Sequence, residues 1–150
     1  MIKISIPGFN DLELRHLVSD YNGTLLPGVA ALLKELSEQL EIHVITADTF
    51  GLAASQLAHL PVKLKIIPLE SQSEAKLAFV DELGAEYVIA FGNGRNDRLM
   101  LKASAVGVAL LQVEGGSAET QASTNVISKD ILDALNLLKN PKRLIATLRS

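Results

Sequence analysis

Polar residues that could carry phosphoryl transfer follow several apolar runs along the chain. Asp20, Thr46 and the segment 93–97 each come directly after such a run, and Lys76 lies a few residues beyond another. A carboxylate such as that of Asp20 can attack phosphorus and form an aspartyl-phosphate, which divides one difficult displacement into two easier steps. A Thr hydroxyl can hold phosphoryl oxygens, and a Lys supplies positive charge to the nucleophile and the transition state. Oxygen ligands nearby can bind Mg²⁺.

The elements that would position these residues alternate between strands and helices. Apolar runs typical of strands lie at 2–6, 12–18, 42–46, 62–67, 87–91, 105–111 and 125–128. Helical patterns lie at 26–40, 49–60, 71–83, 92–104 and 129–140, and Pro141 begins a basic helical tail. This alternation predicts βαβ units, and hence a Rossmann-like three-layer α/β sandwich with a mostly parallel sheet. The first two runs are joined by turn residues, and we expect them to pair as a hairpin.

The spacing of the candidate residues limits what else the chain can contain. Between Asp20 and Thr46 there is room for one helix and turns, and between Thr46 and Lys76 for one helix and one strand. The chain is therefore predicted to be a single domain over 1–150 with no inserted cap domain. In a parallel sheet, ligands bind beyond the carboxyl ends of the strands, so the candidate residues are predicted to meet in one site.

The amino-acid composition and net charge limit the classes of partner that the chain can bind. Hydrophobic residues make up 48% of the chain and charged residues 21%, with a formal net charge of −3. The balance is globular and slightly acidic, so nucleic acid and anionic membrane are poor partners. There is no cysteine, which excludes disulfides and thiolate chemistry. No apolar stretch approaches membrane-spanning length, and we expect a cytoplasmic protein. A homo-oligomer is compatible with the sequence.

Four motifs occur in an order that resembles a known superfamily. They are "DYNGT" at 20–24, "ITAD" at 45–48, the lysine of "SEAKLAFV" at 73–80, and "GNGRND" at 92–97. This order resembles the haloacid dehalogenase-like (HAD-like) superfamily, and the last motif looks most like the phosphorylation domain of P-type ATPases. Over essentially all 150 residues the chain is similar to the small archaeal and bacterial proteins called soluble P-type ATPase-like phosphatases.

The resemblance implies a HAD-like fold and three sets of site residues. The set implied to carry out the chemistry is Asp20, Asn22, Thr46 and Lys76, with Asp20 as the phosphorylated nucleophile. The set implied to bind phosphate is Gly23, Thr24, Thr46, Ala47, Lys76 and Asn96. The set implied to bind Mg²⁺ is Asp20, Asn22, Asn93 and Asp97.

Two positions depart from the family pattern, because Asn replaces Asp at both. At Asn22, phosphatases of the superfamily carry an acid that protonates the leaving group and later activates water. An amide cannot exchange a proton near neutral pH, and general acid–base help is typically worth about 10²- to 10⁴-fold. At Asn93 a usual metal ligand loses its charge, so Mg²⁺ binding should weaken. We therefore expect an attenuated enzyme.

Each motif also has an ordinary structural interpretation. Asp20 could be a turn residue, Thr46 and Asp48 could cap the following helix, and Lys76 could be a solvated lysine on an exposed helix face. "GNGRND" could be only a tight turn, and "VEGGSAET" at 113–120 is interpreted as a surface loop. The three histidines, His16, His43 and His59, show no ligand spacing and are interpreted as incidental.

The resulting interpretation is a Mg²⁺-dependent phosphohydrolase that acts on a small phosphorylated substrate with a good leaving group. One alternative is a non-catalytic protein that binds phosphate and Mg²⁺. A second is a phosphorylation-driven signalling receiver, which also uses Asp, Thr, Lys and Mg²⁺ on a parallel sheet. That class requires an acidic pair after an early strand, which this sequence lacks.

Overall fold

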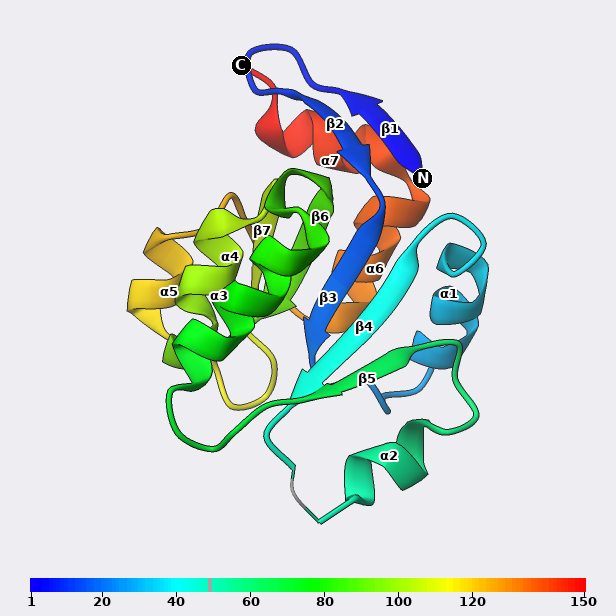
Figure 1. Cartoon of the computed structure of the whole chain (residues 1–150). Helices are drawn as coiled ribbons and strands as arrows, with labels where there is room; N and C mark the ends of the chain where they lie inside the picture. Colours follow the sequence, from blue (N-terminus) through cyan, green and yellow to red (C-terminus); the bar gives the residue numbers. More distant parts are fainter. Residues whose placement is uncertain (49) are drawn as a thin grey trace.

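A six-stranded sheet forms the centre of the computed structural model, which describes residues 1–48 and 50–150 (Figure 1). In chain order its strands are β3 (His16–Asp20), β4 (Glu41–Thr46), β5 (Lys63–Ile66), β6 (Val88–Gly92), β7 (Val106–Leu110) and β8 (Val126–Ser128). Their spatial order is β5-β4-β3-β6-β7-β8, and every neighbouring pair is parallel. The predicted Rossmann-like α/β fold is confirmed.

The central strands are apolar because both of their faces are covered. Every residue of β6 and β7 is buried, as in parallel sheets with helices on both sides. The helices are α1 (Val29–Leu36), α2 (Leu52–Leu57), α3 (Gln72–Leu83), α4 (Arg98–Ala103), α5 (Ala118–Ala122), α6 (Ile131–Lys139) and α7 (Pro141–Leu148). Short 3₁₀ turns cover Ala85–Tyr87 and Arg95–Asp97.

Two apolar cores hold the layers together. Helices α1 and α6 contribute Val29, Leu33 and Leu135 to a large core that also contains residues of the sheet. On the opposite face, Val80 of α3 and Met100 of α4 pack in a smaller core against the central strands. Figure 1 shows α3, α4 and α5 on one side of the sheet and α1 and α6 on the other.

The N-terminal hairpin is shorter than the sequence predicted and separate from the main sheet. Strands β1 (Ile2–Ser5) and β2 (Asp11–Leu14) pair antiparallel as a two-stranded sheet beside α7. The predicted strand 12–18 is thus wrong as one element, because the chain changes sheets at Arg15. Its N–H donates to the Tyr87 carbonyl and its carbonyl accepts from Glu41 N–H, which directs the following residues into β3.

The order of the parallel strands distinguishes a Rossmann-type sheet from the sheet of a signalling receiver. Counted along the chain they run 3-2-1-4-5-6, which is the Rossmann order, whereas receiver-like sheets run 2-1-3-4-5. The order reverses between β3 and β6, so a ligand is expected beyond the ends of these two strands. The signalling-receiver alternative does not fit this topology.

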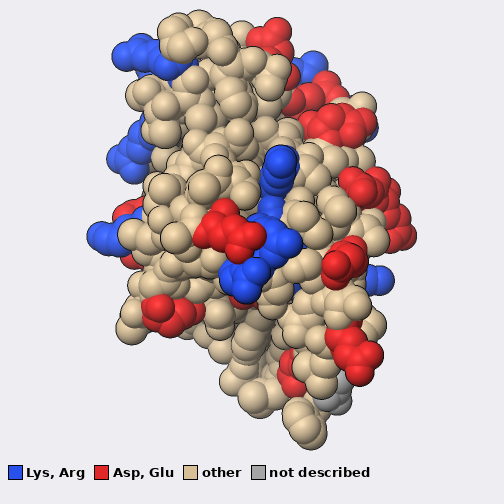
Figure 2. Space-filling model, turned by 90° about the vertical axis from the view of Figure 1, so that its left-hand side faces the viewer, with Lys and Arg blue, Asp and Glu red and all other residues tan. Residues whose placement is uncertain are grey.

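Several predicted boundaries shift by a few residues. Helix α1 ends at Leu36 rather than 40, and α2 covers only Leu52–Leu57; Thr49, where that helix was predicted to begin, lies outside the described residues. The longest helix within the described ranges, α3, has 12 residues, and none of their helices is both long and apolar enough to cross a bilayer. On the face shown in Figure 2, basic and acidic side chains are interspersed.

Candidate active site

A buried cluster of charges lies beyond the ends of β3 and β6, where the strand order reverses. The ammonium of Lys76 on α3 lies 2.6 Å from Asp97 Oδ1 and 3.3 Å from Asp20 Oδ1. It also donates to Asn96 Oδ1 at 3.3 Å. The side chains of Lys76 and Asp97 are 2% and 1% exposed, whereas Asp20 is 21% exposed. Asp20 is therefore the carboxylate of this cluster that a ligand can reach.

The loop after β6 fixes Asp97 in place. Asp97 Oδ2 accepts hydrogen bonds from the N–H groups of Asn93 and Gly94, each at 3.0 Å. Gly92 makes room for it, because a Cβ there would lie 2.5 Å from the Asp97 carboxyl carbon. The first glycine of "GNGRND" is thus required by the close approach of the Asp97 carboxylate to the backbone. Asp97 is used mainly to hold Lys76 against Asp20.

Burial sets the ionisation of the two central groups. It raises the pKa of Asp20 above its usual value, and Asp97 adds to this effect, while Lys76 and the N–H of Asn22 offset only part of it. Burial alone would lower the pKa of Lys76, but Asp97 and Asp20 more than reverse this and raise it. Lys76 is thus a cation at neutral pH, and it assists an Asp20 carboxylate that ionises reluctantly.

Asp20→Asn is expected to raise the melting temperature at pH 7. Because the pKa of Asp20 is raised in the folded protein, ionising it lowers stability as pH rises from about 4 through the raised value. Asn imitates the neutral acid and removes this penalty. The gain should shrink toward pH 4, where Asp20 is protonated, and thermal melts across this range would measure it. A loss of stability at pH 7 would contradict this electrostatic account.

The loop that follows Asp20 is closed by its own residues. Gly23 has a φ of 81°, and a Cβ there would lie 2.8 Å from the Gln112 side chain. The buried Thr24 hydroxyl donates to the Tyr21 carbonyl at 2.7 Å. Gly23 and Thr24 therefore shape the loop beside Asp20, and the Thr24 hydroxyl already donates to the backbone.

Thr46 and Asp48 form the next loop at the same edge. Asp20 pairs with Ile45 in the sheet, so Thr46 lies one residue beyond it. The Thr46 hydroxyl accepts from Asp48 N–H at 3.2 Å, and the half-buried Ala47 lies between them. The Asp48 carboxylate accepts from the N–H groups of Ala53, at 2.7 Å, and of residue 50, at 2.9 Å, which holds its pKa below the usual value. Asp48 therefore acts as a cap, as one interpretation of the sequence expected.

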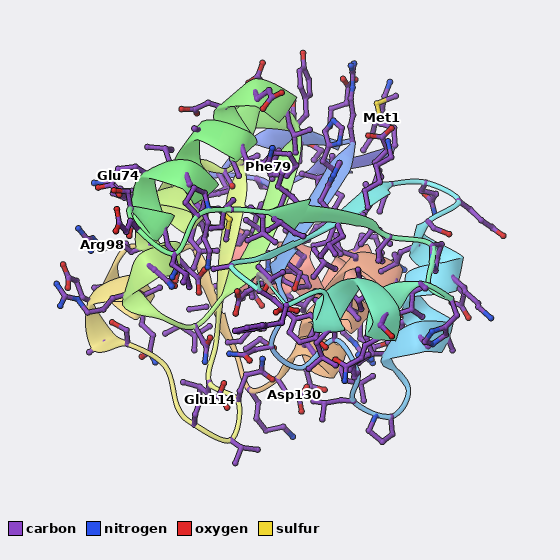
Figure 3. The ribbon with its side chains drawn as sticks, turned by 60° about the horizontal axis from the view of Figure 1, so that its bottom comes forward. Met1, Glu74, Phe79, Arg98, Glu114 and Asp130 are labelled. Carbon is purple, nitrogen blue, oxygen red and sulfur yellow. The ribbon has the colours of Figure 1, made fainter. Side chains whose placement is uncertain are left out.

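Glu114 is a site residue that the sequence did not reveal. It lies on the loop between β7 and α5 and is labelled in Figure 3. Its Oε1 accepts from the side-chain amides of both Asn22, at 3.2 Å, and Asn93, at 3.1 Å. The segment after β7 is a largely exposed loop over 113–117 that leads into α5, as the sequence predicted, and through Glu114 it also joins the two positions where Asn replaces Asp. In the sequence, the only feature of this segment that could have indicated a site residue is Glu114 itself, and nothing distinguishes it from the many other glutamates.

Two further amides complete the surroundings. Gln112, on the same loop, donates from Nε2 to the Asn22 carbonyl at 3.1 Å. Asn96 donates from Nδ2 to Gln72 Oε1 at 2.9 Å while its oxygen accepts from Lys76. The amide of Asn96 is therefore committed within the protein and orients the lysine.

Comparison with known proteins shows the fold. No family model matches the chain. The uncharacterized protein MJ0073 of Methanocaldococcus jannaschii is 43% identical over 83 residues, which are 53% of this chain and 89% of that protein. The 3-deoxy-D-manno-octulosonate 8-phosphate phosphatase of Moraxella catarrhalis, solved with magnesium ion, phosphate ion and a KDO molecule, has a TM-score of 0.68 at 15% identity. The match covers 91% of this chain and 94% of that one.

The catalytic domain of a P-type ATPase is also similar. The chain matches the CPx-ATPase CopB-B structure with a TM-score of 0.60 at 25% identity, over 74% of this chain and 44% of that one. The chain belongs to the same family as MJ0073 and has a capless HAD-like fold. The fold that the four motifs predicted is confirmed, and phosphatases share it.

The donor set of this HAD-like site suits a hard divalent cation. Mg²⁺ is bound by oxygen, usually through one or two carboxylates and several waters. Asp20 and Glu114 provide carboxylates. The side-chain hydrogen bonds of Asn93 use its amide nitrogen, and within the described residues its amide oxygen accepts no hydrogen bond. Asp97 Oδ2 accepts two N–H groups and Oδ1 holds Lys76, so Asp97 offers less to a metal than the sequence implied.

Proposed function

We propose that this HAD-like protein is a Mg²⁺-dependent phosphohydrolase that works through an aspartyl-phosphate on Asp20. The observation that carries the proposal is the contact of Asp20 with the buried ammonium of Lys76, which Asp97 holds in place. This arrangement presents one reachable carboxylate beside a fixed positive charge. The Moraxella phosphatase, with magnesium and phosphate bound, supports the same chemistry in this fold.

The residues suit two displacements at phosphorus. An Asp20 oxygen attacks the phosphorus, the bond to the leaving oxygen breaks, and the leaving group takes its proton from solvent because Asn22 has none to give. Lys76 stabilises the charge on the phosphoryl oxygens, and the Thr46 hydroxyl, at the end of the neighbouring strand, donates to one of them. Water then attacks the phosphorus and releases phosphate and Asp20. Mg²⁺, when bound, neutralises phosphate charge, and Asp20, Asn93 and Glu114 would hold it.

Glu114 contributes the carboxylate that positions 22 and 93 lack. Hydrogen bonds to both amides place it between the loop after β3 and the loop after β6. This supports metal binding despite the two replacements. The amides of Asn22 and Asn93 themselves cannot exchange a proton near neutral pH, so dephosphorylation should be slow.

The surface near Asp20 favours a small substrate or an exposed phosphate tail. A shallow hollow of about 210 Å³ is lined by residues of the 21–26 segment, and another of about 250 Å³ includes Gln112, Val113 and Lys129. Both are smaller than the usual pocket of a drug-sized ligand. We therefore expect a phosphate ester, acyl phosphate or nucleotide tail whose leaving group needs no acid.

Wild-type protein is expected to release phosphate from p-nitrophenyl phosphate and acetyl phosphate when Mg²⁺ is present, and much more slowly from an alkyl phosphate. Excess EDTA should stop the release, and Asp20→Asn should abolish it. Initial rates with malachite-green detection measure all three effects. Thermal stabilisation by phosphate plus Mg²⁺ without any release would instead favour a non-catalytic binder. Equal rates for aryl and alkyl esters would contradict the claim that no residue of the site protonates the leaving group.

A further inference from the structure

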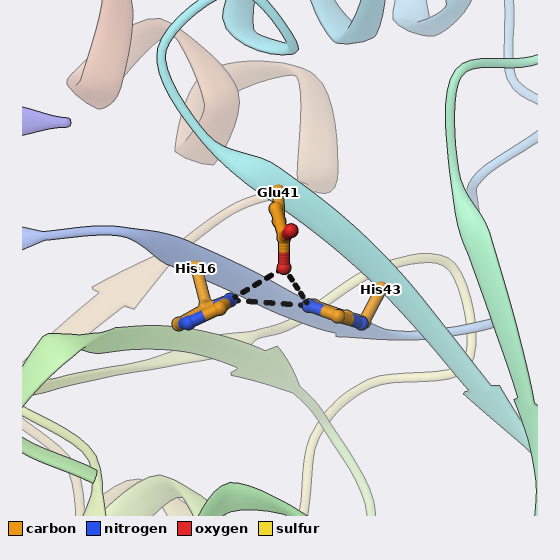
Figure 4. Close-up of side chains that lie close together, drawn as sticks. All are labelled: His16, Glu41 and His43. Carbon is orange, nitrogen blue, oxygen red and sulfur yellow. Dashed lines mark hydrogen bonds and ion pairs between the residues drawn. The ribbon is translucent and has the colours of Figure 1, made fainter. Parts of the chain in front are cut away.

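Two histidines and a glutamate converge at the opposite end of the sheet from Asp20. In the parallel register His16 pairs with Glu41, and Val18 pairs with His43. Side chains alternate between faces along a strand, so His16, Glu41 and His43 share one face of β3 and β4. His16 begins β3 and Asp20 ends it, which separates them by about 13 Å along the strand. Figure 4 shows the three side chains pointing toward a common point.

The distances among the three ligand atoms match one face of a tetrahedral metal site. His16 Nδ1 lies 3.2 Å from His43 Nε2, and Glu41 Oε2 lies 3.4 Å from the first nitrogen and 3.7 Å from the second. Bonds of roughly 2.0–2.2 Å to zinc place tetrahedral ligands about 3.3–3.6 Å apart. Octahedral Mg²⁺ with bonds of roughly 2.0–2.1 Å would need neighbouring ligands about 2.9 Å apart. The spacing of the three ligand atoms is therefore closer to that of a tetrahedral zinc site than to that of an octahedral Mg²⁺ site.

Hydrogen bonding does not account well for this convergence. If one imidazole donates to the other across the 3.2 Å contact, the accepting nitrogen has no proton for Glu41, and Oε2 faces a lone pair whichever ring donates. If both nitrogens donate to Glu41 Oε2, the contacts of 3.4 and 3.7 Å are long for hydrogen bonds. A divalent cation between the three atoms would satisfy all of them at once.

The surroundings hold the three ligands in place. His43 is buried and its ring meets Phe79 of α3 edge-on, with ring centroids 5.3 Å apart. Lys63 donates to Glu41 Oε1 at 3.1 Å, which leaves Oε2 to face the imidazoles. Burial lowers the pKa of both histidines, and that of His43 to about 4, so both rings are neutral at pH 7. Arg15 and Lys63 are the nearby cations, and their charge works against a bound metal.

We propose that His16, Glu41 and His43 form a zinc site at the amino ends of β3 and β4, separate from the phosphoryl site. Two imidazole nitrogens and one carboxylate oxygen are a donor set that zinc accepts and Mg²⁺ does not favour. The Glu41 side chain is 51% exposed and that of His16 16%, so the fourth position is open to water. Bound zinc would join two strands of the sheet and stabilise the fold.

Zinc binding to the EDTA-treated, dialysed protein tests the proposal. Competition against a chromophoric zinc chelator, with Mg²⁺ in excess to occupy carboxylate sites, is expected to show one zinc per chain. Glu41→Gln and His16→Gln should weaken binding by at least about 10- to 100-fold. His59→Gln, which removes an exposed histidine outside the cluster, and Asp20→Asn, at the other site, should bind as the wild type does.

The variants must be folded for this comparison to decide. Glu41 is exposed and His16 partly so. Melting temperatures in EDTA should therefore be similar for the wild type, Glu41→Gln, His16→Gln and His59→Gln, and higher only for Asp20→Asn, for the electrostatic reason given above. Zinc should raise the melting temperature of the wild type but not that of Glu41→Gln. The proposal is overturned if the wild type binds no zinc, or if Glu41→Gln and His16→Gln bind it as the wild type does. Loss of zinc in Asp20→Asn alone would also overturn it, because the ion would then belong to the phosphoryl site.

Discussion

Lys76→Met is expected to lower phosphatase activity by roughly 10³-fold or more and to destabilise the protein by about 3–5 kcal/mol. The ammonium of Lys76 contacts both Asp20 and Asp97, and Met preserves its apolar stem but not its charge. Without it, Asp97 is left buried and unpaired, and the pKa of Asp20 rises further because one of the groups that lower it is gone. Initial rates and denaturant unfolding measure the two effects.

A second substitution separates catalysis from folding. Asp97→Asn in the Lys76→Met background removes the buried unpaired charge while its amide oxygen still accepts from Asn93 and Gly94. Stability should recover in large part, and activity should not. Lys102→Met, on the exposed surface of α4, is the matched control and should change neither. Full activity in the double variant would show that Lys76 acts only through stability.

Asn22→Asp is expected to raise kcat by about 10²- to 10⁴-fold, with the larger gains for alkyl phosphates. The new carboxyl would replace an amide that lies 3.2 Å from Glu114, so repulsion from that carboxylate would raise the pKa of the new acid and increase its protonated fraction. A protonated acid can protonate a poor leaving group and later, once ionised, activate water. Rates with aryl and alkyl esters measured side by side give the result.

The matched control at this position is Asn22→Thr. Thr, like Asn, cannot exchange a proton near neutral pH, so its rate should stay near that of the wild type. If Asn22→Asp and Asn22→Thr turn over equally, the replaced acid does not limit the enzyme. A slow turnover of the wild type would then have a cause other than residue 22.

The sequence predicted the parallel sheet and the meeting of Asp20, Lys76 and Asp97 for a physical reason. Each motif follows an apolar run, and parallel strands end at the same edge, so contacts across 56 and 21 residues follow from topology alone. The split at Arg15 was not predicted, because residues 12–18 were predicted as one strand although Arg15 and His16 interrupt its apolar alternation. Hydrogen bonds to Tyr87 and Glu41 decide it.

Side-chain contacts that depend on the path of a loop or on the register between two strands could not be predicted from the sequence. Glu114 reaches Asn22 across 92 residues through a loop whose path no periodicity encodes. His16 and His43 are 27 residues apart and were interpreted as incidental, because metal-ligand spacing is usually sought within one element. Their contact depends on the register of β3 on β4, which apolar runs alone do not fix.

Acid quenching during turnover tests the central claim most directly. The protein is mixed with acetyl phosphate and Mg²⁺, stopped in acid, digested with pepsin and mapped by mass spectrometry. We expect one phosphoryl group on the peptide that contains Asp20, sensitive to hydroxylamine and absent from Asp20→Asn. Steady release of phosphate while that peptide stays unmodified, or a phosphoryl group found on another residue, would contradict the account.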